Sequence, residues 1–122
     1  MNYKIRMGVP DMDDFWKKLV NKKNNDNLNK NEDKLFRKLV KILKFINANP
    51  RHPGLVSHEI EALSKRYGIK VWQSYLENNK PSAGRIFWVY VPNKLDITII
   101  GIEPHPEDKK KDGYKKVKLS DC

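Results

Sequence analysis

The sequence is poor in the residues that build covalent or metal-based sites. Its one cysteine, Cys122, permits no disulfide within the chain, as is typical of proteins in a reducing cytosol. The sequence has no cysteine cluster, and its three histidines are not closely paired, so it offers no set of zinc ligands. A Gly-rich phosphate loop and the nucleophile motif G-x-S-x-G are also absent. We therefore expect neither a metal nor another cofactor.

Long hydrophobic runs are equally scarce. No apolar stretch approaches the ~20 residues that a membrane-spanning helix needs, and the first residues, MNYKIRMGV, lack the apolar core of a signal peptide. These observations predict a cytoplasmic protein without a membrane partner. The length of 122 residues predicts a single domain, residues 1–122, with one modest core.

Positive charge is what the sequence has in excess. It holds 25 Lys and Arg against 15 Asp and Glu, a formal net charge of +10. Residues 1–50 carry 12 basic and 6 acidic residues, so these fifty residues supply +6 of this charge. Such a balance favours binding to nucleic acid, to an acidic membrane surface or to an acidic protein. The alternative is that these lysines only solvate the outer faces of helices.

Two amphipathic helices are predicted in that basic stretch. Pro10 opens the first, after which apolar residues recur at the i, i+3, i+4, i+7 spacing of one helix face. Asn29, followed three residues later by Glu32, resembles a capping box and predicts a second helix over about residues 30–48. The short polar loop between them makes the pair a helical hairpin. We expect the hairpin to meet the rest of the fold through Trp16, Phe36, Leu39 and Leu43.

Four β-rich segments are predicted, at residues 2–9, 69–77, 85–91 and 95–102, with a short helix from His58 to Tyr67 before the second. The last two segments form a hairpin that turns at residues 92–94. The first strand of this hairpin is apolar on both faces, as is usual for a central strand covered twice. We expect protein to cover one face, and a partner or ligand to use part of the other. The order β-α-α-β-β-β predicts an α+β fold in which two N-terminal helices pack on one face of a twisted antiparallel sheet.

Three stretches in this order resemble the RelE/ParE superfamily of bacterial toxins. They are the connector NPRHPGLVSHEI (Asn49–Ile60), the strand GRIFWVY (Gly84–Tyr90), and the run from Ile100 to Tyr114. The resemblance spans nearly the whole chain and implies one of two activities. RelE-like members cut mRNA on the ribosome without a metal, whereas ParE-like members poison DNA gyrase and lack the nuclease residues. Both imply a cognate antitoxin protein as a partner.

The resemblance also points to three catalytic candidates. Arg85 matches a strand arginine that contacts the scissile phosphate, a role that suits a permanently charged, bidentate guanidinium. His105 lies where some members place a general acid or base, and histidine titrates near neutral pH. Tyr114 matches a C-terminal tyrosine that orients the nucleotide. Each has a structural alternative: an arginine paired with a carboxylate, a hydrogen-bonded loop histidine, and a tyrosine that only packs the tail.

Lysines complete the predicted site. Lys70 is the basic residue on the strand at residues 69–77, and Lys109, Lys110 and Lys111 follow His105. We expect these four to contact nucleic acid, with plain solvated charge as the alternative for the last three. His58, in the connector, is expected to hydrogen-bond the backbone rather than to act in catalysis.

These residues lead to three hypotheses. In the first, the protein is a metal-free mRNA endoribonuclease in which the 2′-OH of the RNA attacks the adjacent phosphate and RNA or the ribosome is the partner. In the second, it is a non-enzymatic ParE-like or degenerate toxin that binds a protein. In the third, it is a basic nucleic-acid-binding domain. The first hypothesis requires Arg85 and His105 to meet, and the predicted hairpin brings the start of one strand to the end of the other.

Overall fold

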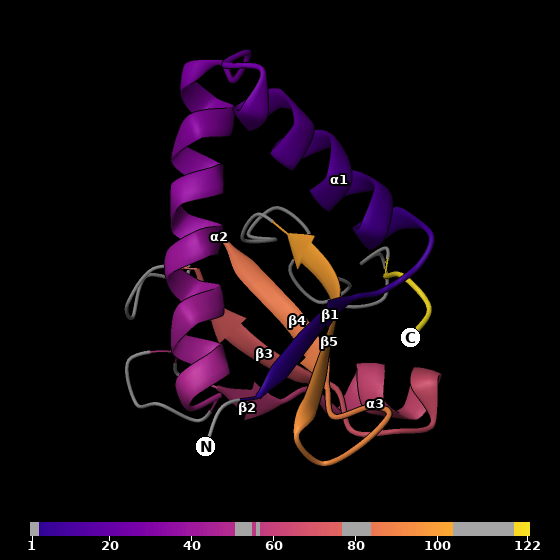
Figure 1. The fold of residues 1–122 in the computed structure, drawn as a ribbon. Coiled ribbons are helices and arrows are strands. Elements are labelled where there is room, and N and C mark those ends of the chain that lie inside the picture. The colour runs from indigo at the N-terminus through magenta and orange to yellow at the C-terminus, as the bar shows by residue number, and fades with distance from the viewer. Residues whose placement is uncertain (1–2, 51–54, 56, 77–83, 104–118) are drawn as a thin grey trace.

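The structure is a computed structural model, and it describes residues 3–50, 55, 57–76, 84–103 and 119–122. These residues form an α+β fold with three helices and one five-stranded sheet (Figure 1). In chain order the elements are β1 (Lys4–Met7), α1 (Asp11–Asn24), α2 (Lys30–Ala48), β2 (His58–Glu59), α3 (Glu61–Tyr67), β3 (Trp72–Tyr75), β4 (Arg85–Val89) and β5 (Asp96–Glu103).

The sheet has the strand order β1-β5-β4-β3-β2 and is mixed rather than antiparallel. Strands β2 to β5 pair antiparallel with their neighbours, but β1 runs parallel to β5, with Lys4 opposite Asp96 and Met7 opposite Ile99. The prediction of a fully antiparallel sheet was therefore wrong at this edge. Its physical reason is that strand direction depends on the path of the intervening chain, which the pattern of residues within β1 does not encode.

The short helix was also predicted to begin too early. His58 and Glu59 form β2, which pairs with Gln73 and Trp72 of β3, and α3 begins only at Glu61. Its end agrees with the prediction, because Gly68 takes the left-handed conformation (φ 76°) that commonly closes a helix. The pairing of β2 with a distant strand thus overrides the local helical pattern.

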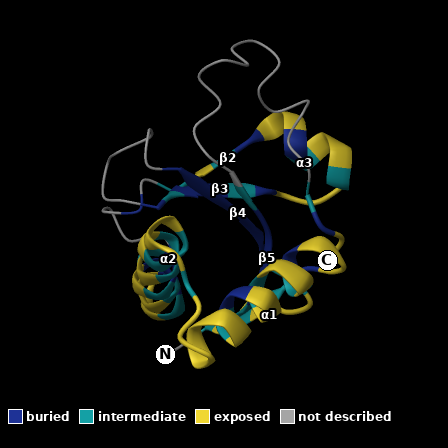
Figure 2. Ribbon diagram, turned by 90° about the horizontal axis from the view of Figure 1, so that it is seen from above, coloured by how far each residue is buried: buried dark blue, intermediate teal, exposed yellow. Residues whose placement is uncertain are grey.

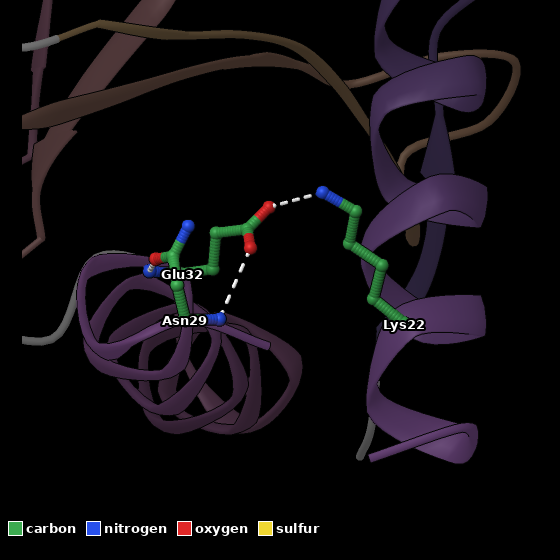
Figure 3. A network of polar contacts seen from close by, with 3 residues as sticks. All are labelled: Lys22, Asn29 and Glu32. Atoms are coloured by element: carbon green, nitrogen blue, oxygen red, sulfur yellow. Dashed lines mark hydrogen bonds and ion pairs between the residues drawn. The ribbon is translucent and has the colours of Figure 1, made fainter. Parts of the chain in front are cut away.

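Local sequence signals define the ends of the long helices. The side chain of Asn29 accepts a hydrogen bond from the Glu32 backbone N–H (2.8 Å), while Oε1 of Glu32 accepts one from the Asn29 N–H (3.1 Å). This confirms the capping box. The other oxygen of Glu32 lies 2.7 Å from Nζ of Lys22 on α1, so the same carboxylate caps α2 and ties the two helices together (Figure 3).

Helices α1 and α2 lie on one side of the sheet and α3 lies on the other (Figure 2). The larger core lies on the α1–α2 side, and Trp88 and Leu39 are among its fully buried members. Trp16 of α1 stacks on Phe36 of α2, with ring centroids 5.8 Å apart. Both rings pack against this core, as does Leu43, so the predicted contact between the hairpin and the sheet is confirmed.

A smaller core lies between the sheet and α3. Its buried members are Ile60, Leu63, Val71, Phe87, Val89 and Ile100. The middle strand β4 contributes to both cores, and all five of its residues are buried. The strand is central, as expected, but protein covers both of its faces, so the expectation that a partner or ligand uses part of one face was wrong for Arg85–Val89.

The last four residues of the chain bind the two sides together. The Ser120 hydroxyl accepts a hydrogen bond from the Met12 backbone N–H (2.5 Å) at the start of α1, and the Ser120 carbonyl accepts one from the Tyr67 hydroxyl of α3. Asp121 exchanges two backbone hydrogen bonds with Val9 (2.9 and 2.7 Å). A Cβ at Gly8 would lie 2.8 Å from the Asp121 carbonyl oxygen, so this close approach needs glycine.

Candidate functional site

A line of polar side chains crosses three strands on the α3 side of the sheet. It consists of His58 on β2, Gln73 on β3 and Arg85 on β4, and we call it the polar row. Nη1 of Arg85 donates to Oε1 of Gln73 at 2.7 Å, and Nε2 of Gln73 lies 3.5 Å from Nε2 of His58. Strand register creates this line, since His58 lies opposite Gln73 and Arg85 lies opposite Tyr75, two residues further along β3.

The row runs from the interior of the protein to its surface. Arg85 and Gln73 are only 3% and 2% exposed, whereas His58 is exposed. The guanidinium of Arg85 also lies 5.3 Å from the centre of the Phe87 ring, where the negative face of the ring stabilises the cation. A permanent positive charge is thus held in the interior by an amide and an aromatic ring.

The Arg85 contact fixes the orientation of Gln73. Because Oε1 faces the guanidinium, the amide nitrogen faces His58. When that nitrogen donates to Nε2 of His58, the neutral imidazole carries its proton on Nδ1. The row therefore presents an imidazole to solvent, one amide away from a buried cation, which is a chemically suitable arrangement for proton transfer near developing negative charge.

A second polar chain, on the opposite side of the sheet, serves structure. Trp88 Nε1 donates to the Ser74 hydroxyl (2.9 Å), Ser74 lies 2.6 Å from the Ser57 hydroxyl, and Ser57 donates to the Pro50 carbonyl (2.7 Å). Since the Ser57 proton is used on Pro50, Ser74 must donate to Ser57. The hydroxyl protons of Ser57 and Ser74 are both used in the hydrogen bonds that hold the connector onto the sheet, so neither serine is a candidate nucleophile.

Only some of the predicted catalytic and binding residues lie among the residues that the structure describes. Arg85 is described, and its predicted role at the phosphate stays a prediction. His105, Tyr114, Lys109, Lys110 and Lys111 lie outside the described residues. Lys70 lies just before β3 and is exposed. The hairpin geometry that the sequence predicted is confirmed in its described part, because Arg85 at the start of β4 pairs with Glu103 at the end of β5.

Two members of the polar row were missed by the sequence interpretation. His58 was assigned to fixing the backbone of the connector, and Gln73 was given no role. A signal for Gln73 was present, because it is a long polar side chain within an otherwise well-covered strand, where a buried amide needs a partner. No signal within the chain could place His58 beside it, since that contact depends on the pairing of β2 with β3.

No three His, Cys, Asp or Glu side chains in the described part of the chain are grouped so that they could hold a metal ion. None of the described helices combines the length and apolarity required to cross a bilayer.

Comparison of the chain with protein-family models, with curated proteins and with solved structures gives no match.

Proposed function

We propose that this protein is a RelE-like toxin of a bacterial toxin–antitoxin pair that cleaves mRNA without a metal. The observation that best supports the proposal is the polar row, in which a buried guanidinium lies one amide away from an exposed imidazole. Metal-free cleavage requires a cation near the phosphorane and a group that moves protons. A chain with a net charge of +10 would attract the RNA.

In the proposed reaction the 2′-OH of the RNA attacks the adjacent phosphate and displaces the 5′-oxygen of the next nucleotide. Arg85 stabilises the charge on the phosphorane, His105 transfers protons and Tyr114 positions a base. Lys70, Lys109, Lys110 and Lys111 contact the RNA backbone. Because the 2′-OH exists only in RNA, DNA is not a substrate. The partners are mRNA on the ribosome and an antitoxin protein, and the proposed compartment is the cytoplasm.

The geometry of Arg85 adds a requirement to this scheme. Arg85 as a whole is 3% exposed and its guanidinium is bonded to Gln73, so a phosphate can reach it only if RNA binding rearranges that contact. His58 needs no such change because its ring is already exposed. We therefore include His58 as a second candidate for proton transfer.

The test is a translation-coupled RNA cleavage assay with the full chain, with and without a metal chelator. We expect the wild type to cleave in both conditions. Arg85→Ala should lower the rate about 10²–10³-fold, and His105→Ala about 10²–10⁴-fold. His58→Ala tests the second candidate, and Lys41→Ala, on the exposed side of α2, is the matched surface control. If the Arg85→Ala and His105→Ala variants both cleave RNA as fast as the wild type, the site assignment is wrong.

A second function, binding of a protein partner without catalysis, is favoured by a groove on the α1–α2 side. Figure 1 shows that the two helices meet at their loop and spread apart. A pocket of about 440 Å³ lies where they diverge over β1, and its lining residues are Ile5, Trp16, Val40, Leu43, Lys44 and Asn47. Apolar residues beside a lysine suit an acidic, amphipathic segment. If the wild type cleaves no RNA but binds a small acidic protein tightly, this second function replaces the first.

A further inference from the structure

A separate pocket lies where β3 begins and β4 ends. It has a volume of about 320 Å³ and is lined by Ile69, Lys70, Trp72, Tyr90 and Val91. Ile69 is 37% exposed, and the Trp72 and Tyr90 rings are half-buried. None of the lining residues is acidic. The pocket therefore combines an apolar floor, two aromatic rings and one ammonium group.

The two rings belong to a rigid aromatic cluster. Trp72 stacks on the buried Trp88, with centroids 5.7 Å apart and planes at 13°, and the Tyr90 ring meets both indoles edge-on. The Tyr90 ring also lies 6.3 Å from the Tyr3 ring. Rings held in this way lose little freedom when a flat ligand stacks on them, which favours affinity.

The charge around the pocket narrows the class of ligand. Lys70 supplies the one cationic group among the lining residues. By register Glu59 lies opposite Trp72, but it does not line the pocket. A flat ring joined to an anion is the ligand that matches an aromatic floor beside an ammonium group, and a nucleotide of a single strand has both parts.

We propose that this pocket binds single-stranded nucleic acid, with one base against the face of one of the two nearly perpendicular rings, Trp72 and Tyr90, and the edge of the other, and a backbone phosphate on Lys70. It is distinct from the polar row. Tyr90 directly follows the end of β4 and is five residues after Arg85, a separation of roughly 17 Å for an extended chain. The Tyr90 ring packs on the α1–α2 side, whereas Arg85 belongs to the α3 side.

The binding test uses probes that cannot be cleaved, so it does not rest on the proposed nuclease activity. Fluorescence anisotropy is measured with labelled 2′-O-methyl hexaadenylate, with the matching DNA, and with an abasic strand of equal length. We expect hexaadenylate to bind at least about fivefold more tightly than the abasic strand, since stacking of one base contributes about 1–3 kcal/mol. The RNA-type and DNA probes show which nucleic acid is preferred, and binding of either one in this base-dependent way supports the pocket.

Variants then locate the site. Lys70→Glu should weaken binding about tenfold. It should also reduce the steepness of the plot of log binding constant against log salt concentration by roughly 0.7. Lys41→Glu makes the same charge change on α2, away from the pocket, and should have a smaller effect. Glu59→Gln should strengthen binding, because it removes the carboxylate opposite Trp72. Tyr90→Leu should weaken binding about 5- to 150-fold, while Tyr90→Phe, which keeps the ring, should bind like the wild type.

Three results would overturn the inference. They are absence of binding by the wild type, equal binding of the abasic strand, and equal effects of the Lys70 and Lys41 variants. The abasic probe tests stacking on the unaltered protein, so a folding defect in Tyr90→Leu leaves the test decisive. RNA cleavage that survives Lys70→Glu with binding unchanged would refute this pocket and the Lys70 contact with RNA, while leaving the proposed chemistry at Arg85 and His105 untouched.

Discussion

On the α1–α2 side of the sheet nearly all buried strand side chains are apolar, whereas the α3 side divides into an apolar half and the polar row. On the first side Ser74 is buried among apolar residues, and Trp88 and Ser57 satisfy its hydrogen bonds. On the second side, Phe87 and Val89 pack under α3, while Arg85 on the same strand meets Gln73. The first side is thus built for stability, and the second combines packing with a buried charge.

The difference shows on which side of this small sheet a buried charge is accommodated. A buried cation destabilises a fold unless hydrogen bonds and nearby groups compensate it. The larger of the two cores lies on the α1–α2 side, while Arg85 on the α3 side is bonded to Gln73 and lies against the Phe87 ring. The following predictions test this division.

The largest effect is expected for Trp88→Ala. Trp88 is fully buried, stacks on Trp72 and donates to Ser74, so its removal leaves a cavity and a hydroxyl without its donor. We expect a loss of about 3–5 kcal/mol in the free energy of unfolding, measured by urea denaturation. Val89→Ala is the control, because it alters the next residue of β4 on the α3 side. If Val89→Ala costs as much as Trp88→Ala, the two sides do not differ as we describe.

The second effect concerns the polar row. Arg85→Met should destabilise the protein by about 1–3 kcal/mol, because the Gln73 carbonyl loses its charged donor while staying buried. Gln73→Leu alone leaves the guanidinium without its amide partner. The double variant should recover part of the loss, with a coupling energy of about 0.5–3 kcal/mol. Strict additivity of the two changes would mean that the 2.7 Å contact contributes nothing to stability.

A smaller effect is expected at the start of α2. Asn29→Ala removes the acceptor for the Glu32 N–H and should cost about 0.5–2 kcal/mol. Asn29→Asp keeps an acceptor at this position and should be close to the wild type. Thermal unfolding followed by circular dichroism compares the two. A loss in both variants would mean that residue 29 stabilises the helix in some other way than through its side-chain oxygen.

How far the sequence predicts this structure depends on the range of the interaction. The Asn29 cap and the Gly68 stop act within a few residues, and both were predictable from local chemistry. The parallel pairing of β1 was not, because no residue in Lys4–Met7 encodes the direction of its neighbour. The same holds for the site, where Arg85 carries a signal in its own strand but its link to His58 requires two strand registers.

A break in the alternation of β5 illustrates the same limit. Phe87 pairs with Gly101 but Trp88 pairs with Ile99, so Ile100 is an extra residue in the ladder. As a result Ile100 packs on the α3 side, while Ile102, two residues later, packs on the α1–α2 side. Strict alternation would place these two side chains on one side. The bulge also sets Glu103 opposite Arg85, and a pattern of period two cannot predict this pairing.

The smallest effect is expected at Tyr67, which joins α3 to the end of the chain. Tyr67→Phe removes the hydrogen bond to the Ser120 carbonyl and should cost about 0.5–1.5 kcal/mol at neutral pH. Burial raises the pKa of Tyr67 from 10.0 to about 12, and the nearby Cys122 and Asp121 also raise it. Because the folded state holds this proton more tightly, the added stability is fully present below pH 10.0 and is lost as the pH rises towards about 12. In Tyr67→Phe the free energy of unfolding, measured by urea denaturation, should therefore fall less over this pH range than in the wild type. The difference in phenolate absorbance between wild type and variant isolates Tyr67 from the other tyrosines, and a transition near 10 in that difference would show that Tyr67 is not buried as described.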